Sequence, residues 1–144
     1  MRSEYPLEFE EQAAYFRHIE QMVKTGQWPA EMLLTYANIN EQKFGPGETK
    51  IGRIKRLKKL KAQGHKTGVP DSTTPIPRYP YHGLYIEFKS RDPNAPVSPD
   101  QRHYIDSLNR LGYLARLCYG SDEAIELAEL YLKLPKWKNP EVCY

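Results

Sequence analysis

Apolar residues recur along the chain at spacings that separate helices from strands. Positions three and four apart share one face of a helix, whereas short apolar or alternating runs bounded by Gly, Pro or Asn are typical of strands. Four helices are predicted at residues 7–24, 49–62, 98–111 and 121–134. Strands are predicted at 32–37, 83–89 and 113–119, with a weaker one at 72–76. This order predicts an α/β fold with a central mixed sheet.

The predicted helices have capping or stop signals at their ends and an apolar face. Ser98, Pro99 and Gln101 combine an N-cap, a proline at the first helical position and a capping-box residue. Gly26, Gly64 and Gly112 are expected to stop the three helices before them. The positions expected to face the core are Tyr15, Phe16, Ile19, Met22, Val23, Ile51, Ile54, Leu57, Leu60, Ile105, Leu108, Leu111, Ile125, Ala128 and Leu132.

The strand at 83–89 carries chemistry on one face. Side chains alternate across a strand, so the apolar Leu84, Ile86 and Phe88 share one face and Tyr85, Glu87 and Lys89 share the other. An isolated Glu-x-Lys is usually the solvated face of an edge strand. Asp71 precedes the strand at 72–76. If the two strands pair as an antiparallel hairpin, Asp71 and Glu87 lie at the same end of the sheet.

Two converging carboxylates and one lysine favour phosphodiester hydrolysis. Mg²⁺ and similar cations bind oxygen ligands and keep several waters, so Asp71, Glu87 and the carbonyl of Phe88 are sufficient to hold one. Such a cation polarises a phosphoryl oxygen and activates a bound water. The ammonium of Lys89 can orient that water or stabilise developing charge.

Composition indicates a single globular domain. The 144 residues are 40% hydrophobic and 27% charged, and no apolar run approaches the roughly 18 residues of a membrane span. The polar N-terminus lacks the apolar segment of a signal peptide, so a cytoplasmic protein is expected. Cys118 and Cys143 have neither the number nor the spacing of a disulfide framework or zinc site, which predicts free thiols.

The net charge of +3 conceals a local basic cluster. No acid lies between Thr49 and Pro70, and the rest of the chain is therefore acidic overall. The basic residues are Lys50, Arg53, Lys55, Arg56, Lys58, Lys59, Lys61 and Lys66. A solvated helix face is one interpretation, but such a face normally includes pairing Glu residues. Their absence favours a polyanionic partner such as DNA.

Four motifs together resemble the virus-type replication-repair nuclease (VRR-NUC) family of the PD-(D/E)XK superfamily. They are Gly68-Val69-Pro70-Asp71, Tyr81-His82-Gly83-Leu84-Tyr85-Ile86-Glu87-Phe88-Lys89, Val97-Ser98-Pro99-Asp100-Gln101 and Leu111-Gly112-Tyr113. The resemblance covers nearly the whole chain and implies a restriction-endonuclease-like core, a central mixed β-sheet flanked by helices, as one domain over residues 1–144. One departure is Ser72-Thr73-Thr74 after Asp71, where similar proteins have apolar residues. It puts the burial and regularity of that strand in doubt.

The resemblance also implies roles for individual residues. Asp71 and Glu87 would be metal ligands, Lys89 the catalytic lysine and Gln101 a supporting residue, with Mg²⁺ or Mn²⁺ as the cofactor. The family acid on the first helix is matched to Glu8, four residues before Gln12, with Glu11 as the alternative. Gln101 also has a structural explanation as the capping-box residue, and both roles can hold together.

The activity implied is that of a divalent-metal-dependent DNA endonuclease in a bacterial or phage-infected cell. Small members of the family resolve branched DNA such as Holliday junctions as homodimers, and a dimer suits symmetric double incisions. A flap or single-strand nuclease is the alternative within the family. A DNA-binding module without catalysis and an interaction protein remain as different classes, although converging carboxylates would only repel phosphate in a pure binder.

Overall fold

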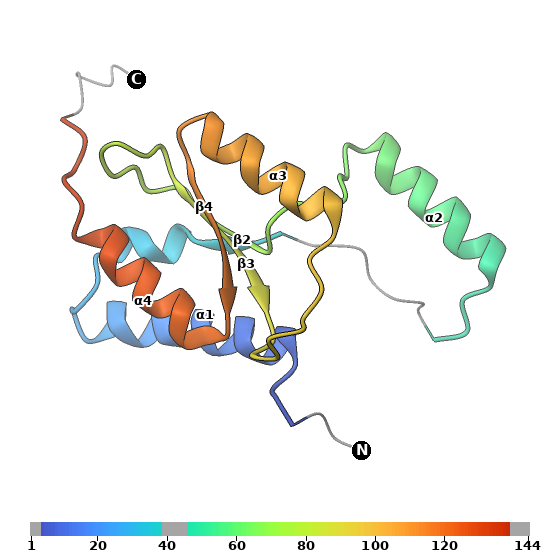
Figure 1. The fold of residues 1–144 in the computed structure, drawn as a ribbon, viewed down its shortest axis with the longest axis horizontal. Coiled ribbons are helices and arrows are strands. Elements are labelled where there is room, and N and C mark those ends of the chain that lie inside the picture. Colours follow the sequence, from blue (N-terminus) through green and yellow to red (C-terminus); the bar gives the residue numbers. More distant parts are fainter. Residues whose placement is uncertain (1–3, 39–45, 139–144) are drawn as a thin grey trace.

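The described residues, 4–38 and 46–138, form a mixed β-sheet with helices on both faces in this computed structural model (Figure 1). The helices are α1 (Glu8–Lys24), α2 (Lys50–Ala62), α3 (Pro99–Arg110) and α4 (Ser121–Leu132), together with a 3₁₀ turn, η1 (Ala30–Leu34). The strands are β1 (Tyr36–Ala37), β2 (Ser72–Thr74), β3 (Leu84–Lys89) and β4 (Leu114–Tyr119). The predicted α/β class is confirmed.

The sheet has the strand order β1-β2-β3-β4. β2 pairs antiparallel with β1 and β3, whereas β3 and β4 run parallel and are joined through α3. Ser72 pairs with Ile86, and this register brings Asp71 beside Glu87 at one end of the β2–β3 hairpin. The predicted hairpin is therefore confirmed.

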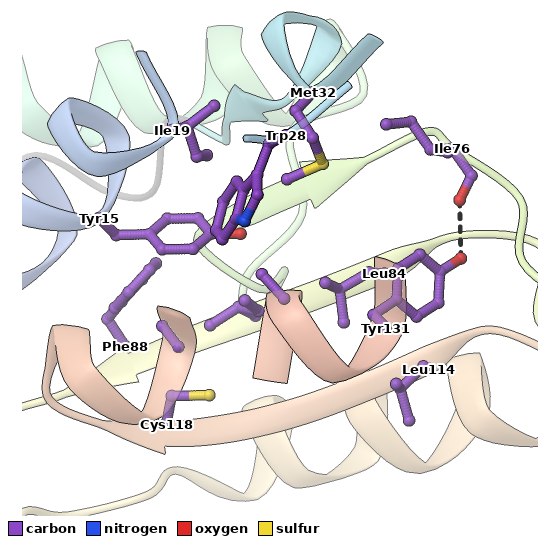
Figure 2. Packing of buried hydrophobic residues seen from close by; sticks show 13 residues of the cluster. Tyr15, Ile19, Trp28, Met32, Ile76, Leu84, Phe88, Leu114, Cys118 and Tyr131 are labelled. Atoms are coloured by element: carbon purple, nitrogen blue, oxygen red, sulfur yellow. Dashed lines mark hydrogen bonds between the residues drawn. The ribbon is translucent and has the colours of Figure 1, made fainter. Parts of the chain in front are cut away.

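The main core lies on the sheet face covered by α1 and α4. Leu84, Ile86 and Phe88 of β3 are all buried there against Tyr15 of α1 and Tyr131 of α4 (Figure 2). The Tyr131 hydroxyl donates a 2.7 Å hydrogen bond to the carbonyl of Ile76, so even the polar atom of this large ring is satisfied. Cys118 is a buried free thiol in the same cluster, as predicted.

α3 covers the opposite face of the sheet, next to β4. The side-chain amide of Asn109 donates to the carbonyl of Ala115 and accepts from its amide N–H, both at 3.0 Å. These two bonds satisfy the outer edge of β4 and fix the helix on the strand. The beginning of α3 is fixed by the predicted capping box: Ser98 Oγ accepts from the Gln101 N–H, and Gln101 Oε1 accepts from the Ser98 N–H.

The predicted strand at 32–37 is wrong over most of its length. Residues 32–34 belong to the 3₁₀ turn η1, which follows Pro29, and only Tyr36 and Ala37 pair with β2. Met32 is the buried residue of that turn. The apolar residues next to it therefore do not indicate a buried strand. The loop expected around Asn40 and Phe44, as well as Cys143, lies outside the described residues.

The doubt about β2 is resolved in favour of burial. β2 is only three residues long, but all three side chains are buried. Thr73 Oγ1 accepts a 3.0 Å hydrogen bond from the Asn38 amide, and Thr74 Oγ1 lies 3.0 Å from the hydroxyl of Thr35. The hydroxyls make hydrogen bonds with side chains of neighbouring segments, so the strand needs no apolar residues to be interior.

Three predicted core positions are exposed instead. The apolar stripe of α2 is not buried: Ile51 and Ile54 are 68% and 47% exposed, and no residue of the helix is buried. Figure 1 shows α2 standing away from the sheet, and no described helix or strand packs closely against it. Leu111 is 67% exposed because α3 ends at Arg110 and Leu111 already belongs to the turn.

Candidate active site

The polar face of β3 is buried rather than solvated. Glu87 and Lys89 are only 2% and 4% exposed, because β3 has a strand on each side and α3 lies over this face of the sheet. The edge-strand interpretation of Glu-x-Lys is thus wrong for this chain. Burying a carboxylate and an ammonium is costly unless each has partners, so this arrangement indicates a specific role.

Asp71 is oriented by the strand that carries Glu87. Its Oδ2 accepts a 2.8 Å hydrogen bond from the backbone N–H of Phe88. The bond joins the residue before β2 to the end of β3 and holds the Asp71 carboxylate beside Glu87. Sequence spacing predicted this proximity, but not the hydrogen bond that fixes it.

Gln101, at the start of α3, connects the acid and the base. Its Nε2 donates to Glu87 Oε1 through a short hydrogen bond, and its Oε1 accepts from Lys89 Nζ at 3.2 Å. Lys89 Nζ also lies 3.5 Å from Glu87 Oε1 and 3.8 Å from Glu8 Oε1. The same Gln101 closes the capping box, so its structural contact and its contact with the site residues occur together.

A pocket of about 390 Å³ opens over these side chains. Its lining residues are Glu8, Thr67, Gly68, Asp71, Glu87, Ser98, Asp100 and Gln101. Thr67 and Asp100 were not predicted as site residues. Thr67 Oγ1 donates to Asp100 Oδ2 at 3.0 Å, which ties the segment before Asp71 to the first turn of α3.

Gly68 shows how closely that segment lies on α3. Its φ is +77°, and an added Cβ would fall 2.6 Å from the backbone carbon of Asp100. Only glycine combines this backbone conformation with such an approach. The Gly68 in the motif before Asp71 was the one sequence signal that could have indicated the contact.

The electrostatics of Glu87 are unusual for a carboxylate. Burial, and secondarily the neighbouring Asp71, raise the pKa of Glu87 to about 8. Its Oε2 is a buried oxygen with no hydrogen-bond donor in the described structure. An unsatisfied buried carboxylate oxygen beside a second carboxylate is a suitable environment for a divalent cation, which would remove both penalties at once.

Few protein side chains are available to bind such a cation. Across residues 4–38 and 46–138, no three side chains of His, Cys, Asp or Glu gather closely enough to hold a metal ion. Asp71 and Glu87 are therefore the carboxylate pair, and backbone carbonyl, water or substrate oxygens would complete the coordination. Mg²⁺ suits such a sparse set because it usually retains several waters.

The two candidate acids on α1 have different surroundings. Glu8 lines the pocket, and its side chain is 49% exposed. Glu11 is 2% exposed and lies 2.7 Å from both Arg91 Nε and the Ser121 N–H. The Arg91 guanidinium lowers the pKa of Glu11. Glu11 joins α1 to the start of α4, and Glu8 is the acid that faces the pocket.

The predicted DNA-binding bases lie on or just after α2. None of them lines the pocket, although Lys66 directly precedes Thr67, which does. Most of their side chains are exposed: Lys50, Lys55, Lys58, Lys59, Lys61 and Lys66. Arg53 and Arg56 are half-buried, and Arg56 forms a 2.7 Å ion pair with Glu48. The cluster is thus slightly less positive than its sequence suggests, but it still presents a basic surface.

The mixed sheet carries a carboxylate pair and a buried lysine at one end of its central hairpin, which is the arrangement that the resemblance to nucleases implies. The VRR-NUC domain model matches residues 11–122, and the chain belongs to this family, whose members are nucleases. A solved structure described as a VRR_NUC domain protein is similar, with a TM-score of 0.69 and 26% identity over 91% of this chain and 92% of that chain. No curated protein matches. The family resemblance and the expected fold are confirmed.

Proposed function

We propose that this chain is a divalent-metal-dependent DNA endonuclease that uses the pocket between β3, α1 and α3. The observation that supports this most is Glu87. Its carboxylate is buried, has one oxygen without a donor, and lies beside Asp71 and within 3.5 Å of the Lys89 ammonium. A site made only for stability would have no need of a second carboxylate there.

Two carboxylates of the pocket would bind the metal ion. Asp71, Glu87 and the carbonyl of Phe88 would hold the cation, and Glu8, which lines the pocket from α1, would accept hydrogen bonds from water bound there rather than bind the cation directly. A bound Mg²⁺ or Mn²⁺ would supply Lewis-acid polarisation of the scissile phosphate and acidify a nearby water.

Lys89 would act on the phosphate itself. Its ammonium would donate a hydrogen bond to the attacking water or to the phosphate oxygens as negative charge develops. Gln101 would act as a positioning residue, because it donates to Glu87 and accepts from Lys89 and so fixes their relative orientation.

The basic surface of α2 is proposed to bind the DNA backbone. Lysines that are solvated and clustered on one helix supply contacts to phosphates that are independent of base sequence. DNA is the polyanion we favour, because the chain belongs to a family of nucleases. No helix within the described ranges is long and apolar enough to cross a membrane.

Branched DNA is the proposed substrate, and a homodimer the proposed form. One chain presents one such pocket in its described part, whereas resolution of a four-way junction requires two symmetric incisions. The unburied stripe of α2 is consistent with a protein partner. A flap or single-strand nuclease is the second candidate, since the open pocket does not by itself select paired DNA.

One assay tests the proposal directly. Purified protein is incubated with labelled junction, flap, splayed and linear DNA in Mg²⁺, Mn²⁺ or EDTA. We expect paired nicks in the junction with either metal and none in EDTA. Glu87→Gln, Asp71→Asn and Lys89→Met should each lower the rate at least about 100-fold while DNA binding persists. Full cleavage by any of these variants, or in EDTA, would exclude the mechanism.

Two further results would redirect the proposal. Cleavage confined to flaps, with the same dependence on Glu87 and metal, would identify the second candidate. Binding of all substrates without cleavage under any metal condition would indicate the module without catalysis.

A further inference from the structure

The apolar positions at the start of α2 have no partner in the described chain. Ile51 and Ile54 are exposed on a helix that packs closely against no other described helix or strand. Lys58 follows Ile54 by four residues and Ile51 by seven, so it lies on the same helical face. Two β-branched apolar residues left in water on a well-formed helix are unfavourable, so they are candidates for contact with another molecule.

The first turn of α1 offers a surface of opposite charge. Leu7 and Phe9 are 51% and 65% exposed there. The acids Glu4, Glu8 and Glu10 surround them and are exposed as well. An apolar patch with an acidic rim therefore complements an apolar patch with a basic rim.

The two surfaces lie on the same side of the molecule. Figure 1 shows α2 projecting outward from one side of the molecule, with α1 beginning at its end nearer to that side. A second copy related by a two-fold axis on this side would meet both surfaces at once. Such an arrangement is self-complementary, because each copy gives one α2 and receives the other.

We propose that α2 of each copy docks by Ile51 and Ile54 on the first turn of α1 of a second copy, around Leu7 and Phe9. This deepens the homodimer of the proposed function and rests on it. Direct pairing of one α2 with the other is the less favourable geometry, because it would bring two basic helices together. Docking on the acidic turn of α1 instead neutralises charge.

This reciprocal docking, in which each copy gives its α2 to the α1 of the other and which we call the exchange, has a consequence for the pocket. Glu8 belongs to the same turn as Leu7 and Phe9 and lines the pocket. A docked α2 would therefore place its lysines near the partner's pocket, where a DNA backbone must pass. Dimer formation would join DNA binding to the site, although each chain keeps its own carboxylate pair.

A complementation experiment tests the exchange. Phe9→Ser and Ile54→Ser are made separately, and the dimer dissociation constant is measured by sedimentation for each variant and for their equimolar mixture. A dimer of either variant has both of its interfaces damaged, so we expect its dissociation constant to be at least about tenfold higher than that of the wild type. In the mixture one interface keeps both native partners, so mixed dimers should form more tightly than either variant dimer.

Leu130→Ser on α4 is the matched control. Leu130 is 56% exposed but lies outside both proposed surfaces, so the dissociation constant should not change. Urea denaturation at a protein concentration low enough for the wild type to be monomeric should give each variant the wild-type free energy of unfolding, because dimerisation itself adds stability at higher concentration. A lower value for Ile54→Ser in the monomer would mean that the chain's own residues cover the stripe, and would overturn the proposal.

The other outcomes are equally informative. A mixture that behaves as the average of the two variants, or a wild-type protein that stays monomeric, would also overturn the exchange. Cleavage is measured on the same samples. A monomer that cleaves leaves the nuclease standing without the exchange, whereas a complementing dimer that never cleaves leaves the exchange standing without the nuclease.

Discussion

β3 and α2 invert the usual relation between polarity and burial. β3 buries a glutamate and a lysine, at 2% and 4% exposure, while α2 leaves Ile51 and Ile54 largely in water. Both arrangements cost stability when the chain is considered alone. The costs are consistent with the contacts that we propose: a cation and a phosphate at β3, and DNA and a second copy at α2.

The two regions also differ in how they are held. Glu87 and Lys89 are oriented by contacts from three directions: the neighbouring strands, Gln101 of α3 and Glu8 of α1. α2 is formed by local signals, including the Thr49 side chain that accepts the Gly52 N–H, and has no close packing in the described structure. A catalytic site needs fixed geometry, whereas a helix that meets a long polyanion does not.

Equal truncations in the two regions should give the largest contrast. Ile86→Ala on β3 should lower the free energy of unfolding by about 2–5 kcal/mol, since Ile86 is 1% exposed in the core. Ile54→Ala on α2 should change it by less than about 0.5 kcal/mol in the monomer. Urea denaturation at low protein concentration measures both. Similar losses would mean that α2 packs on the body of the chain.

The two acids of α1 should separate stability from activity. Glu11→Ala should cost about 3 kcal/mol of stability, because it leaves Arg91 and the Ser121 N–H without their shared acceptor. Glu8→Ala should leave the melting temperature almost unchanged and lower cleavage. Thermal unfolding and nicking assays on both variants provide the comparison. A reversed result would assign the pocket role to Glu11.

Glu87 should make the apo protein less stable as pH rises. Its pKa is raised to about 8, so between about pH 4.5 and 8 the folded state binds more protons than the unfolded state, and stability falls with increasing pH. Glu87→Gln should remove this slope and gain about 1–2 kcal/mol at pH 8. Urea denaturation in EDTA at several pH values measures it. Equal slopes in wild type and variant would contradict the burial argument.

The smallest effect is expected from single charges of α2. Lys59→Ala, on α2 but off the face of Ile51 and Ile54, should weaken DNA binding a few-fold and reduce the slope of log affinity against log salt by about 0.9, the value for one phosphate contact. Lys24→Ala, at the far end of α1, is the control and should not change the slope. Fluorescence anisotropy across a salt series is the measurement. An unchanged slope for Lys59→Ala would remove this lysine from the interface with DNA.

Much of the site could be predicted because its signals are local or periodic. The alternation of β3 separated Glu87 and Lys89 from the apolar face, and the capping signals at Ser98 placed Gln101 at a helix start. Antiparallel pairing then brought Asp71 to Glu87. Only the assembled chain could show that Glu87 has an oxygen without a donor, or that Gln101 bonds to both Glu87 and Lys89, since α3 reaches the site from a distant part of the sequence.

The sequence by itself determined which segments become helices and which residue types they display. Backbone propensity, caps and periodicity act within a few residues, so α1, α3, α4 and the existence of α2 were predictable. Tertiary structure decided burial. Apolar stripes with the same helical spacing are buried against the core in α1 and partly exposed to water in α2. A stripe is buried only where another element faces it, and this depends on the strand order and on how the helices pack.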